Sequence, residues 1–346
     1  MATNTTEIVP TGAIRYNTDS NKMECFDGTK WWEIVVSSPD LNGGTRVLNM
    51  GGYAPTYADN IEYVTVETAG NATVFGDLTY ARHLHTGFSS NTRACSAGGS
   101  GGDGANDDRI DYVTFSSTGD AIDFGNLTVK RYGSASGGNQ TRGVIATGYY
   151  NVPAATEQNV IDYVTIASTG NAVDFGDTVV KRYAPLMASS PTRFVFGGGQ
   201  NPTPGGAAVA TLDYITTTTT GNAHDFGDLS NPMYYTHGQG NSSATRGLFG
   251  GGYQPATPTK SSNYDYLTFS TLGNSVSFGD LAYARFSSCT GGSRIRGLWL
   301  GGRTPTLQNY IDYVSIQTGG QAIDFGDKQT SFSYGTAASN GHGGLG

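Results

Sequence analysis

The sequence is poor in charge, cysteine and long apolar runs, and each shortage excludes a class of protein. Charged residues make up 14% of its 346 positions, against about 25% in ordinary domains. Its three cysteines, Cys25, Cys95 and Cys289, are too few and too widely spaced for a disulfide framework or a thiolate zinc site. The apolar run at residues 31–36 is far shorter than the ~20 residues of a membrane-spanning helix, so we expect no membrane insertion.

The charge that is present is acidic, with a net value of −8, which argues against nucleic-acid binding. The first residues lack the basic start and apolar stretch of a secretion signal, so we expect the chain to fold in a reducing cytoplasm. In contrast, 21 Tyr and 15 Phe are too many for a disordered chain. Glycine is also abundant, at 51 residues. The composition therefore indicates a folded chain that is rich in turns.

A unit of about 50 residues occurs six times along the chain, and such a period is typical of repeat architectures. Each copy contains a Phe-Gly dipeptide, at Phe75-Gly76, Phe124-Gly125, Phe175-Gly176, Phe226-Gly227, Phe278-Gly279 and Phe325-Gly326. Each also contains an arginine, at Arg46, Arg93, Arg142, Arg193, Arg246 and Arg296. An acid precedes a tyrosine in every copy, at Glu62, Asp111, Asp162, Asp213, Asp265 and Asp312.

Spacing within the unit separates a constant part from a variable part. The acid lies 14 residues before the glycine of Phe-Gly in all six copies, and the residues between are β-branched or aromatic around a Thr-Gly-Asn type of turn. This pattern predicts a β-hairpin of constant length. The segments before the acid vary in length and are predicted to be loops, at 53–60, 100–109, 149–160, 200–211, 253–263 and 303–310. Binding residues are found disproportionately on such loops.

Tyrosines at the start of these loops are candidate binding residues, because tyrosine combines a large contact area with a hydrogen-bonding tip. They are Tyr53, Tyr149, Tyr150 and Tyr253. Packing between repeats is the alternative role for them.

About fifty residues of all-β repeat, six times over, predict a six-bladed β-propeller over residues 41–346. We expect four strands per blade, with a less regular outer strand after Phe-Gly-Asp-Leu, and a last blade completed by residues 331–335. The Gly-Gly pairs and the period resemble Kelch-type propellers, although the tryptophan late in each Kelch repeat is missing. The motif Ile-Asp-Tyr-Val-Thr-Ile followed by Asp-Phe-Gly-Asp, at 161–177, more closely resembles repeats in structural proteins of marine bacteriophages.

Residues 1–40 lie outside the repeat and are predicted to form a β-meander of three short strands, with turns at 18–21 and 27–28. So small a sheet cannot be stable alone, and its Ile14, Phe26, Trp31 and Trp32 require a partner. Either the meander docks on the propeller or it associates with copies of itself. The run from Gly12 to Trp31 resembles a short module of phage tail-fibre and other virion proteins, which implies a role in anchoring or oligomerisation.

Candidate chemistry is sparse. The six arginines and six acids are expected to form a structural Arg–carboxylate pair in each sheet, or to bind backbone carbonyls, rather than a binding ring. The Asp-Phe-Gly triplet is expected to be a turn in which glycine takes a positive φ. Neither Asp103, Asp107 and Asp108 nor His83 and His85 have the spacing of a metal site, so we expect no metal and no cofactor.

Taken with the two resemblances, these patterns predict a non-enzymatic phage virion protein: a tail fibre, an appendage or a capsid decoration. It would be assembled in the host cytoplasm, would contact other virion proteins and a host-surface glycan or receptor, and would be a homo-oligomer, with a trimer favoured. Two alternatives remain open. One is a carbohydrate-degrading propeller enzyme of a phage appendage, and the other is a cellular Kelch-like interaction module.

Overall fold

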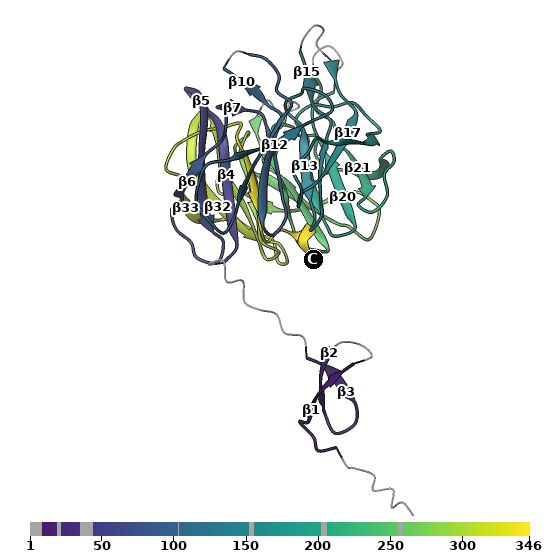
Figure 1. Cartoon of the computed structure of the whole chain (residues 1–346). Helices are drawn as coiled ribbons and strands as arrows, with labels where there is room; N and C mark the ends of the chain where they lie inside the picture. The colour runs from purple at the N-terminus through teal and green to yellow at the C-terminus, as the bar shows by residue number, and fades with distance from the viewer. Residues whose placement is uncertain are drawn as a thin grey trace, which may run out of the picture. The chain divides into compact units, whose positions relative to one another are not determined.

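Strands make up almost all of the regular structure in the computed structural model, which describes residues 9–18, 22–34, 44–102, 104–151, 156–201, 206–254 and 259–346. Within these ranges the one helix is a short 3-10 turn, η1 (Gly343–Leu345), and no helix there is long and apolar enough to cross a membrane. The chain separates into two compact units, Met1–Leu41 and Asn42–Gly346. Both consist of predominantly antiparallel sheets, whose strands are labelled in Figure 1.

The first unit is a sheet of order β1-β2-β3, formed by β1 (Ile14–Asn17), β2 (Lys22–Phe26) and β3 (Trp31–Glu33). The sequence predicted these three strands, while most of the predicted turn at 18–21 lies outside the described residues. The second turn is held by Asp27, whose carboxylate accepts the backbone N–H groups of Thr29 and Lys30 at 2.7 and 2.8 Å. Hydrogen bonds from Thr29 are the largest cause that holds the pKa of Asp27 well below its usual range.

One face of this small sheet is apolar and exposed. Ile14 pairs with Cys25, which pairs with Trp32, so all three side chains lie on the same face. Tyr16 and Met23 are the next pair on that face. Ile14 is 61% exposed and Trp32 is 53% exposed, so a sizeable apolar surface faces outward.

The opposite face of the sheet carries the remaining two of the four predicted anchor residues. Phe26 and Trp31 pack against each other there, with ring centroids 5.3 Å apart, and the Arg15 guanidinium lies over Trp31. Ion pairs cover the rest of this face, between Arg15 and Glu24 and between Lys22 and Glu33. The predicted anchor residues therefore belong to two faces, of which the Ile14 face is the apolar one.

In the second unit, six sheets share one strand order within the described residues. The inner-edge strands are β34 (Thr336–Ser339), β8 (Thr86–Ser89), β13 (Ala135–Gly138), β19 (Leu186–Ser189), β24 (Asn241–Ser242) and β30 (Cys289–Gly292). Next come β4 (Arg46–Ala54), β9 (Arg93–Ala97), β14 (Arg142–Ala146), β20 (Arg193–Gly197), β25 (Arg246–Gly250) and β31 (Arg296–Thr304). The third strands are β5 (Thr56–Thr65), β11 (Arg109–Thr114), β17 (Val160–Thr165), β21 (Thr211–Thr216), β28 (Asn263–Thr268) and β32 (Thr306–Ser315). The outer-edge strands are β6 (Thr73–Asp77), β12 (Ile122–Asn126), β18 (Val173–Asp177), β22 (His224–Asp228), β29 (Val276–Asp280) and β33 (Ile323–Asp327).

Several short strands occur in addition to the four strands of each sheet. The pairs are β7 (Arg82–His83) with β10 (Ser100–Gly101), β15 (Tyr149–Tyr150) with β16 (Thr156–Glu157), and β26 (Tyr253–Gln254) with β27 (Thr259–Lys260). A further strand, β23 (His237–Gly238), runs parallel to β30. It replaces the start of a regular inner strand, because the fourth repeat has two more residues here than the third.

The inner-edge strands contact one another in a cycle, in the order β34, β8, β13, β19, β24, β30 and back to β34. Their residues are buried throughout, whereas the outer-edge strands are mostly exposed except around the phenylalanine of Phe-Gly. Apolar clusters fill the spaces between neighbouring sheets, and the phenylalanine of each Phe-Gly lies in one of them, buried or nearly so. Each sheet is therefore stabilised mainly by its two neighbours.

A closed ring of backbone hydrogen bonds joins the six repeats. In each repeat one residue donates its N–H to the carbonyl of the equivalent residue in the preceding repeat, at 2.6–3.2 Å. These residues are Leu84, Gly133, Ala184, Tyr235, Ser287 and Tyr334, and Leu84 closes the ring onto Tyr334. All six have φ between 54° and 63°. A left-handed backbone costs roughly 1–2 kcal/mol for a non-glycine residue. Five of the six residues are not glycine, so at these positions the ring forms in spite of an unfavourable backbone conformation.

Three details of the predicted fold are corrected. The strand that follows Phe-Gly-Asp-Leu lies at the inner edge of the next sheet, not at an outer edge. The C-terminal strand β34 accordingly pairs with β4 and completes the sheet of the first repeat rather than that of the sixth. The constant hairpins are confirmed as β5–β6 and its five equivalents. The Phe-Gly glycine lies in a strand at a register shift, as at Gly176 with φ 148°, not in a turn.

Candidate functional site

The predicted pairing between the two recurring charged positions is wrong. Each acid on the third strand is buried, and four of the six pair with an arginine that the sequence analysis did not single out. These pairs are Arg82–Asp111, Arg131–Asp162, Arg182–Asp213 and Arg285–Asp312. All four arginines are fully buried, and desolvation lowers their pKa values although the carboxylates oppose it. Constant spacing was the available signal, because each of them lies six residues after a Phe-Gly glycine.

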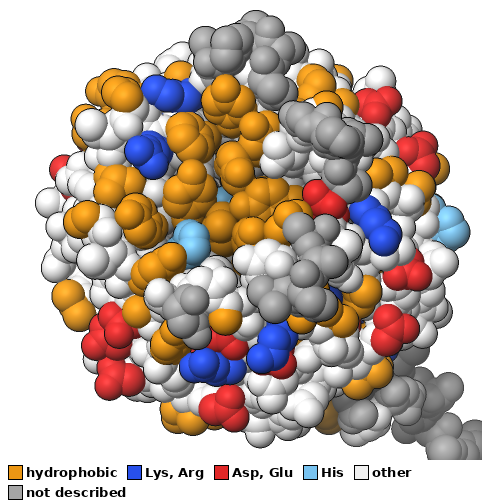
Figure 2. Space-filling model, turned by 90° about the horizontal axis from the view of Figure 1, so that it is seen from above, with side chains coloured by type: hydrophobic (Ala, Val, Ile, Leu, Met, Phe, Trp, Pro, Cys, Tyr) orange, Lys and Arg blue, Asp and Glu red, His pale blue; other side chains and the backbone are white. Residues whose placement is uncertain are grey.

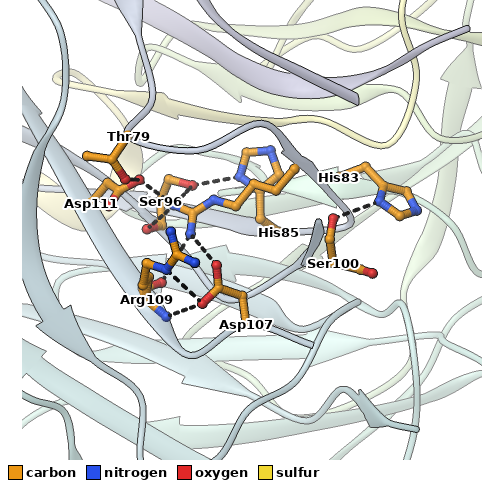
Figure 3. Close-up of polar contacts among 9 residues, drawn as sticks. Thr79, His83, His85, Ser96, Ser100, Asp107, Arg109 and Asp111 are labelled. Atoms are coloured by element: carbon orange, nitrogen blue, oxygen red, sulfur yellow. Dashed lines mark hydrogen bonds and ion pairs between the residues drawn. The ribbon is translucent and has the colours of Figure 1, made fainter. Parts of the chain in front are cut away.

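Figure 3 shows the first of these networks. The Arg82 Nη2 atom lies 2.9 Å from the Asp111 carboxylate and 3.1 Å from the Ser96 carbonyl. Asp111 also accepts the Thr79 hydroxyl, and Asp107 lies 3.8 Å from Arg82. With the charge of Asp111 matched by Arg82 and held inside the sheet, the network is structural.

Two repeats satisfy the acid differently. Asp265 has Met233 in place of the arginine and instead accepts hydrogen bonds from the Ser230 and Ser275 hydroxyls at 2.7 and 2.6 Å. Glu62 lies near Lys328, a fully buried lysine whose Nζ is 3.1 Å from the centroid of the Phe332 ring. Burial lowers the pKa of Lys328 to about 8 and raises that of Glu62.

The six predicted arginines form a seam between neighbouring sheets. Each donates from Nη1 to a backbone carbonyl of the following repeat, for example Arg142 to Thr217 at 2.8 Å, and Arg296 returns to Val66 of the first repeat at 2.9 Å. The guanidinium also lies over the tyrosine that follows the acid, at 4.9 Å between Arg142 and Tyr163. The remaining contacts are Arg46–Phe115, Arg93–Ile166, Arg193–Phe269 and Arg246–Gln317. Binding to carbonyls was the second of the two structural roles considered for these arginines.

An aromatic face lies at the end of the second unit that carries β10 and β15 in Figure 1. Figure 2 shows hydrophobic side chains gathered at its centre. We define the aromatic face by a continuous network of rings with centroids 4.5–6.4 Å apart: Tyr53, Tyr57, His83, Tyr132, Tyr149, Tyr183, Tyr234, Tyr235, His237, Tyr253, Phe286 and Tyr334. Most of these rings are half-buried.

Three of the four tyrosine candidates, Tyr53, Tyr149 and Tyr253, belong to this face, while Tyr150 lies beside it on β15 without a ring contact among the described residues. The rest were missed, although they follow a pattern. The position seven residues after the Phe-Gly glycine is aromatic in five repeats: His83, Tyr132, Tyr183, Tyr234 and Phe286. Isolated bridges such as Tyr132↔Tyr149 and Tyr234↔Tyr253 bring that position beside the start of each variable segment.

The aromatic face includes a cleft of about 340 Å³, whose lining residues are Tyr132, Tyr149, Tyr183, Tyr235, Glu157, Gln200, Asn201 and Gly206. Burial raises the pKa of Tyr132 to about 12 and that of Tyr183 well above its usual range. These hydroxyls are therefore neutral at physiological pH. The lining offers tyrosine hydroxyls, one carboxylate and two side-chain amides around aromatic surfaces.

The C-terminal residues lie at the end of the second unit opposite the aromatic face (Figure 1). His342 is buried, with its Nε2 atom 3.2 Å from the Ser89 carbonyl and its Nδ1 atom accepting the Gly344 N–H at 3.1 Å. Gln140 donates to the Leu345 carbonyl at 2.8 Å.

The metal candidates do not converge. His83 and His85 make separate contacts, with the Ser100 carbonyl and the Ser96 hydroxyl (Figure 3). Asp103 lies outside the described residues, and Asp107 pairs with Arg82 and Arg109. No group of three potential metal ligands occurs in the part of the chain that the structure describes.

Comparison with models of known protein families and with curated proteins finds no match to this chain.

Proposed function

We propose that the second unit is a six-bladed β-propeller whose blades are the six sheets. The bonds that join the sixth repeat to the first support this, because they repeat the geometry of every other junction. The Gly70 N–H meets the Phe325 carbonyl at 2.8 Å, as Gly119 meets Phe75 at 2.9 Å. An open row of sheets would leave the first and last repeats without these partners.

We propose that this propeller is a non-enzymatic binding protein of a bacteriophage virion, acting as a fibre, appendage or decoration subunit. The virion origin rests on the resemblance of the repeat and of residues 1–40 to phage structural proteins. The binding role rests on one observation, the aromatic face. Half-buried tyrosines held together by the blades combine apolar area with hydroxyl tips, which is typical of recognition surfaces.

The same face favours binding over hydrolysis. Glycoside hydrolysis generally uses two carboxyl groups about 5–9.5 Å apart. The described lining of the cleft contains one carboxylate, Glu157. Release of reducing ends from host envelope polysaccharide by the purified chain would contradict a non-enzymatic role.

The test is localisation followed by competition. Antibodies against the purified chain should label intact particles of the phage that encodes it, and excess soluble chain should lower adsorption of those particles to host cells. Labelling confined to the host lysate, with particles unlabelled, would overturn the virion proposal. Particles that are labelled but adsorb normally in excess soluble chain would overturn the host-binding role.

We further propose that the apolar face of the first unit, around Ile14 and Trp32, anchors the chain through copies of itself or another virion protein. A chain lacking residues 1–40 should be absent from particles while the remaining unit keeps its melting temperature, because the two units are separately compact. A normal copy number of the truncated chain on particles would rule out the anchor.

A further inference from the structure

We propose that the cleft formed by Tyr132, Tyr149, Tyr183 and Tyr235 binds a neutral saccharide, with Glu157 and Gln200 as its hydrogen-bonding partners. The inference rests on the proposed binding role of the aromatic face and specifies its ligand.

The rings form a surface and not a cage. Tyr132, Tyr149 and Tyr183 lie 5.4–5.8 Å apart between centroids and pack edge to face, and Tyr235 meets Tyr183 at 5.6 Å in the same manner. Rings at these distances are in contact with one another. Each ring packs its edge against the face of another, so no two parallel ring faces are available to enclose a quaternary ammonium group. A sugar ring needs only one such surface, on which its C–H face can stack.

Charge in the cleft argues against anionic ligands. Its described lining contains no lysine or arginine, and Glu157 has no ion-pair partner among the described residues. A phosphate, sulfate or uronate would therefore meet a carboxylate without a compensating cation. A neutral polyol finds hydrogen-bonding partners for its hydroxyl groups, because the Glu157 oxygens accept hydrogen bonds and the tyrosine hydroxyls both donate and accept.

The cleft is pre-formed. Tyr132 and Tyr149 exchange backbone hydrogen bonds at 3.1 and 2.8 Å, and Tyr183 and Gln200 do so at 3.0 and 2.7 Å. The Gln200 amide is oriented by donation to the Gly206 carbonyl at 2.9 Å. Groups held this way lose little conformational freedom on binding. The volume, about 340 Å³, is at the small end of ligand sites and suits one or two sugar residues.

The experiment is calorimetric titration of the purified full-length chain with four probes. They are the neutral and acidic polysaccharide fractions extracted from the host envelope, a heparin hexasaccharide and tetramethylammonium. We expect binding of the neutral fraction alone, weakened at least tenfold by Tyr183→Ala and severalfold by Gln200→Ala. Tyr183→Phe should retain most of the affinity because it keeps the ring, and a melting temperature of Tyr183→Ala close to that of the wild type checks that its loss of affinity does not reflect misfolding.

Tyr283→Ala is the matched control, since Tyr283 is an exposed tyrosine that packs on Tyr310 outside the aromatic face. It should bind as the wild type does. Tighter binding of the heparin fragment, the acidic fraction or tetramethylammonium would overturn the inference, as would equal binding by Tyr183→Ala. If the soluble chain competes for adsorption but the neutral fraction does not bind, the saccharide inference fails and the proposed function stands. If the chain neither labels particles nor competes, the proposed function itself fails.

Discussion

At the residue scale, six equivalent acids show that one structural need has several chemical solutions. A carboxylate on the third strand must be satisfied inside the protein, because burying an unpaired charge is costly. Four repeats use an arginine, one uses the serine hydroxyls around Asp265, and one places Glu62 near Lys328. The repeat thus keeps the acid and changes its partner.

This variation predicts the effect of Arg131→Met. The substitution places beside Asp162 the residue type that Met233 provides at the equivalent position of another repeat. The substitution leaves Asp162 buried without its cation and should lower the free energy of unfolding by about 3–5 kcal/mol. Adding Ala172→Ser, which copies Ser275, should restore about 1–2 kcal/mol through a hydrogen bond to the carboxylate. Urea unfolding of the three proteins measures both values.

Met233→Leu is the control for that experiment, because no carboxylate depends on Met233 for charge. Its effect should be small, as in other volume-conserving core substitutions. A loss below 1 kcal/mol in Arg131→Met would show that the buried pair does not need its cation.

At the element scale, glycine sets how closely neighbouring sheets approach. A Cβ atom added at Gly176 would lie 2.5 Å from the Gly221 carbonyl group in the turn of the next repeat. At Gly170, whose φ of 155° resembles the 148° of Gly176, a Cβ would meet nothing within 4 Å. The two positions have similar φ values and differ in what an added Cβ would contact.

Gly176→Ala should therefore destabilise the protein more than Gly170→Ala does. Both variants carry the backbone cost of alanine at positive φ, and only the first must also push two sheets apart, at an added cost of about 1–3 kcal/mol. Thermal melting of both variants gives the difference. Equal melting temperatures would mean that the contact between sheets is loose enough to absorb a methyl group.

The strands also show which parts of the fold could be predicted from the sequence. The constant 14-residue spacing predicted each hairpin, because a hairpin is local and its turn residues are visible. The place of the strand after Phe-Gly-Asp-Leu was not predictable in this way, because it depends on pairing with strands of the next repeat. The aromatic face was half-predicted for the same reason. Tyr149 stood out at the start of a variable segment, but its neighbour Tyr132 follows a buried arginine far from any predicted loop.

At the scale of the whole molecule, the C-terminal segment makes two contacts that connect the end of the repeat array to its beginning. Strand β34 completes the sheet of the first repeat, and the residues after it cover one end of the axis. Tyr334, which closes the hydrogen-bonded ring, lies just before this strand. One short segment thus joins the two ends of the repeat array, which makes its environment decisive for the stability of the whole unit.

Buried histidines near this axis predict that the protein loses stability in mild acid. Burial lowers the pKa of His342 to about 4 and of His237 to about 3, and it holds the pKa of His85 well below 6.5. Below pH 6.5 the unfolded chain binds protons that the folded chain does not, so the free energy of unfolding falls with pH. Between pH 6.5 and 5 each group should contribute about 1.6 kcal/mol to the loss, because half of the imidazoles in the unfolded chain are already protonated at pH 6.5. Burial raises the pKa values of Asp213 and Asp312, which acts in the opposite direction at lower pH.

His342→Gln isolates one of these groups. It should reduce the loss of stability between pH 6.5 and 5 by about a third, since two of the three buried imidazoles remain. Urea midpoints at the two pH values give the comparison. The exposed His224→Gln should keep the pH dependence of the wild type and serves as the matched control. An unchanged pH dependence in His342→Gln would mean that this imidazole is protonated in the folded protein, and that the C-terminal cover of the axis is open to water.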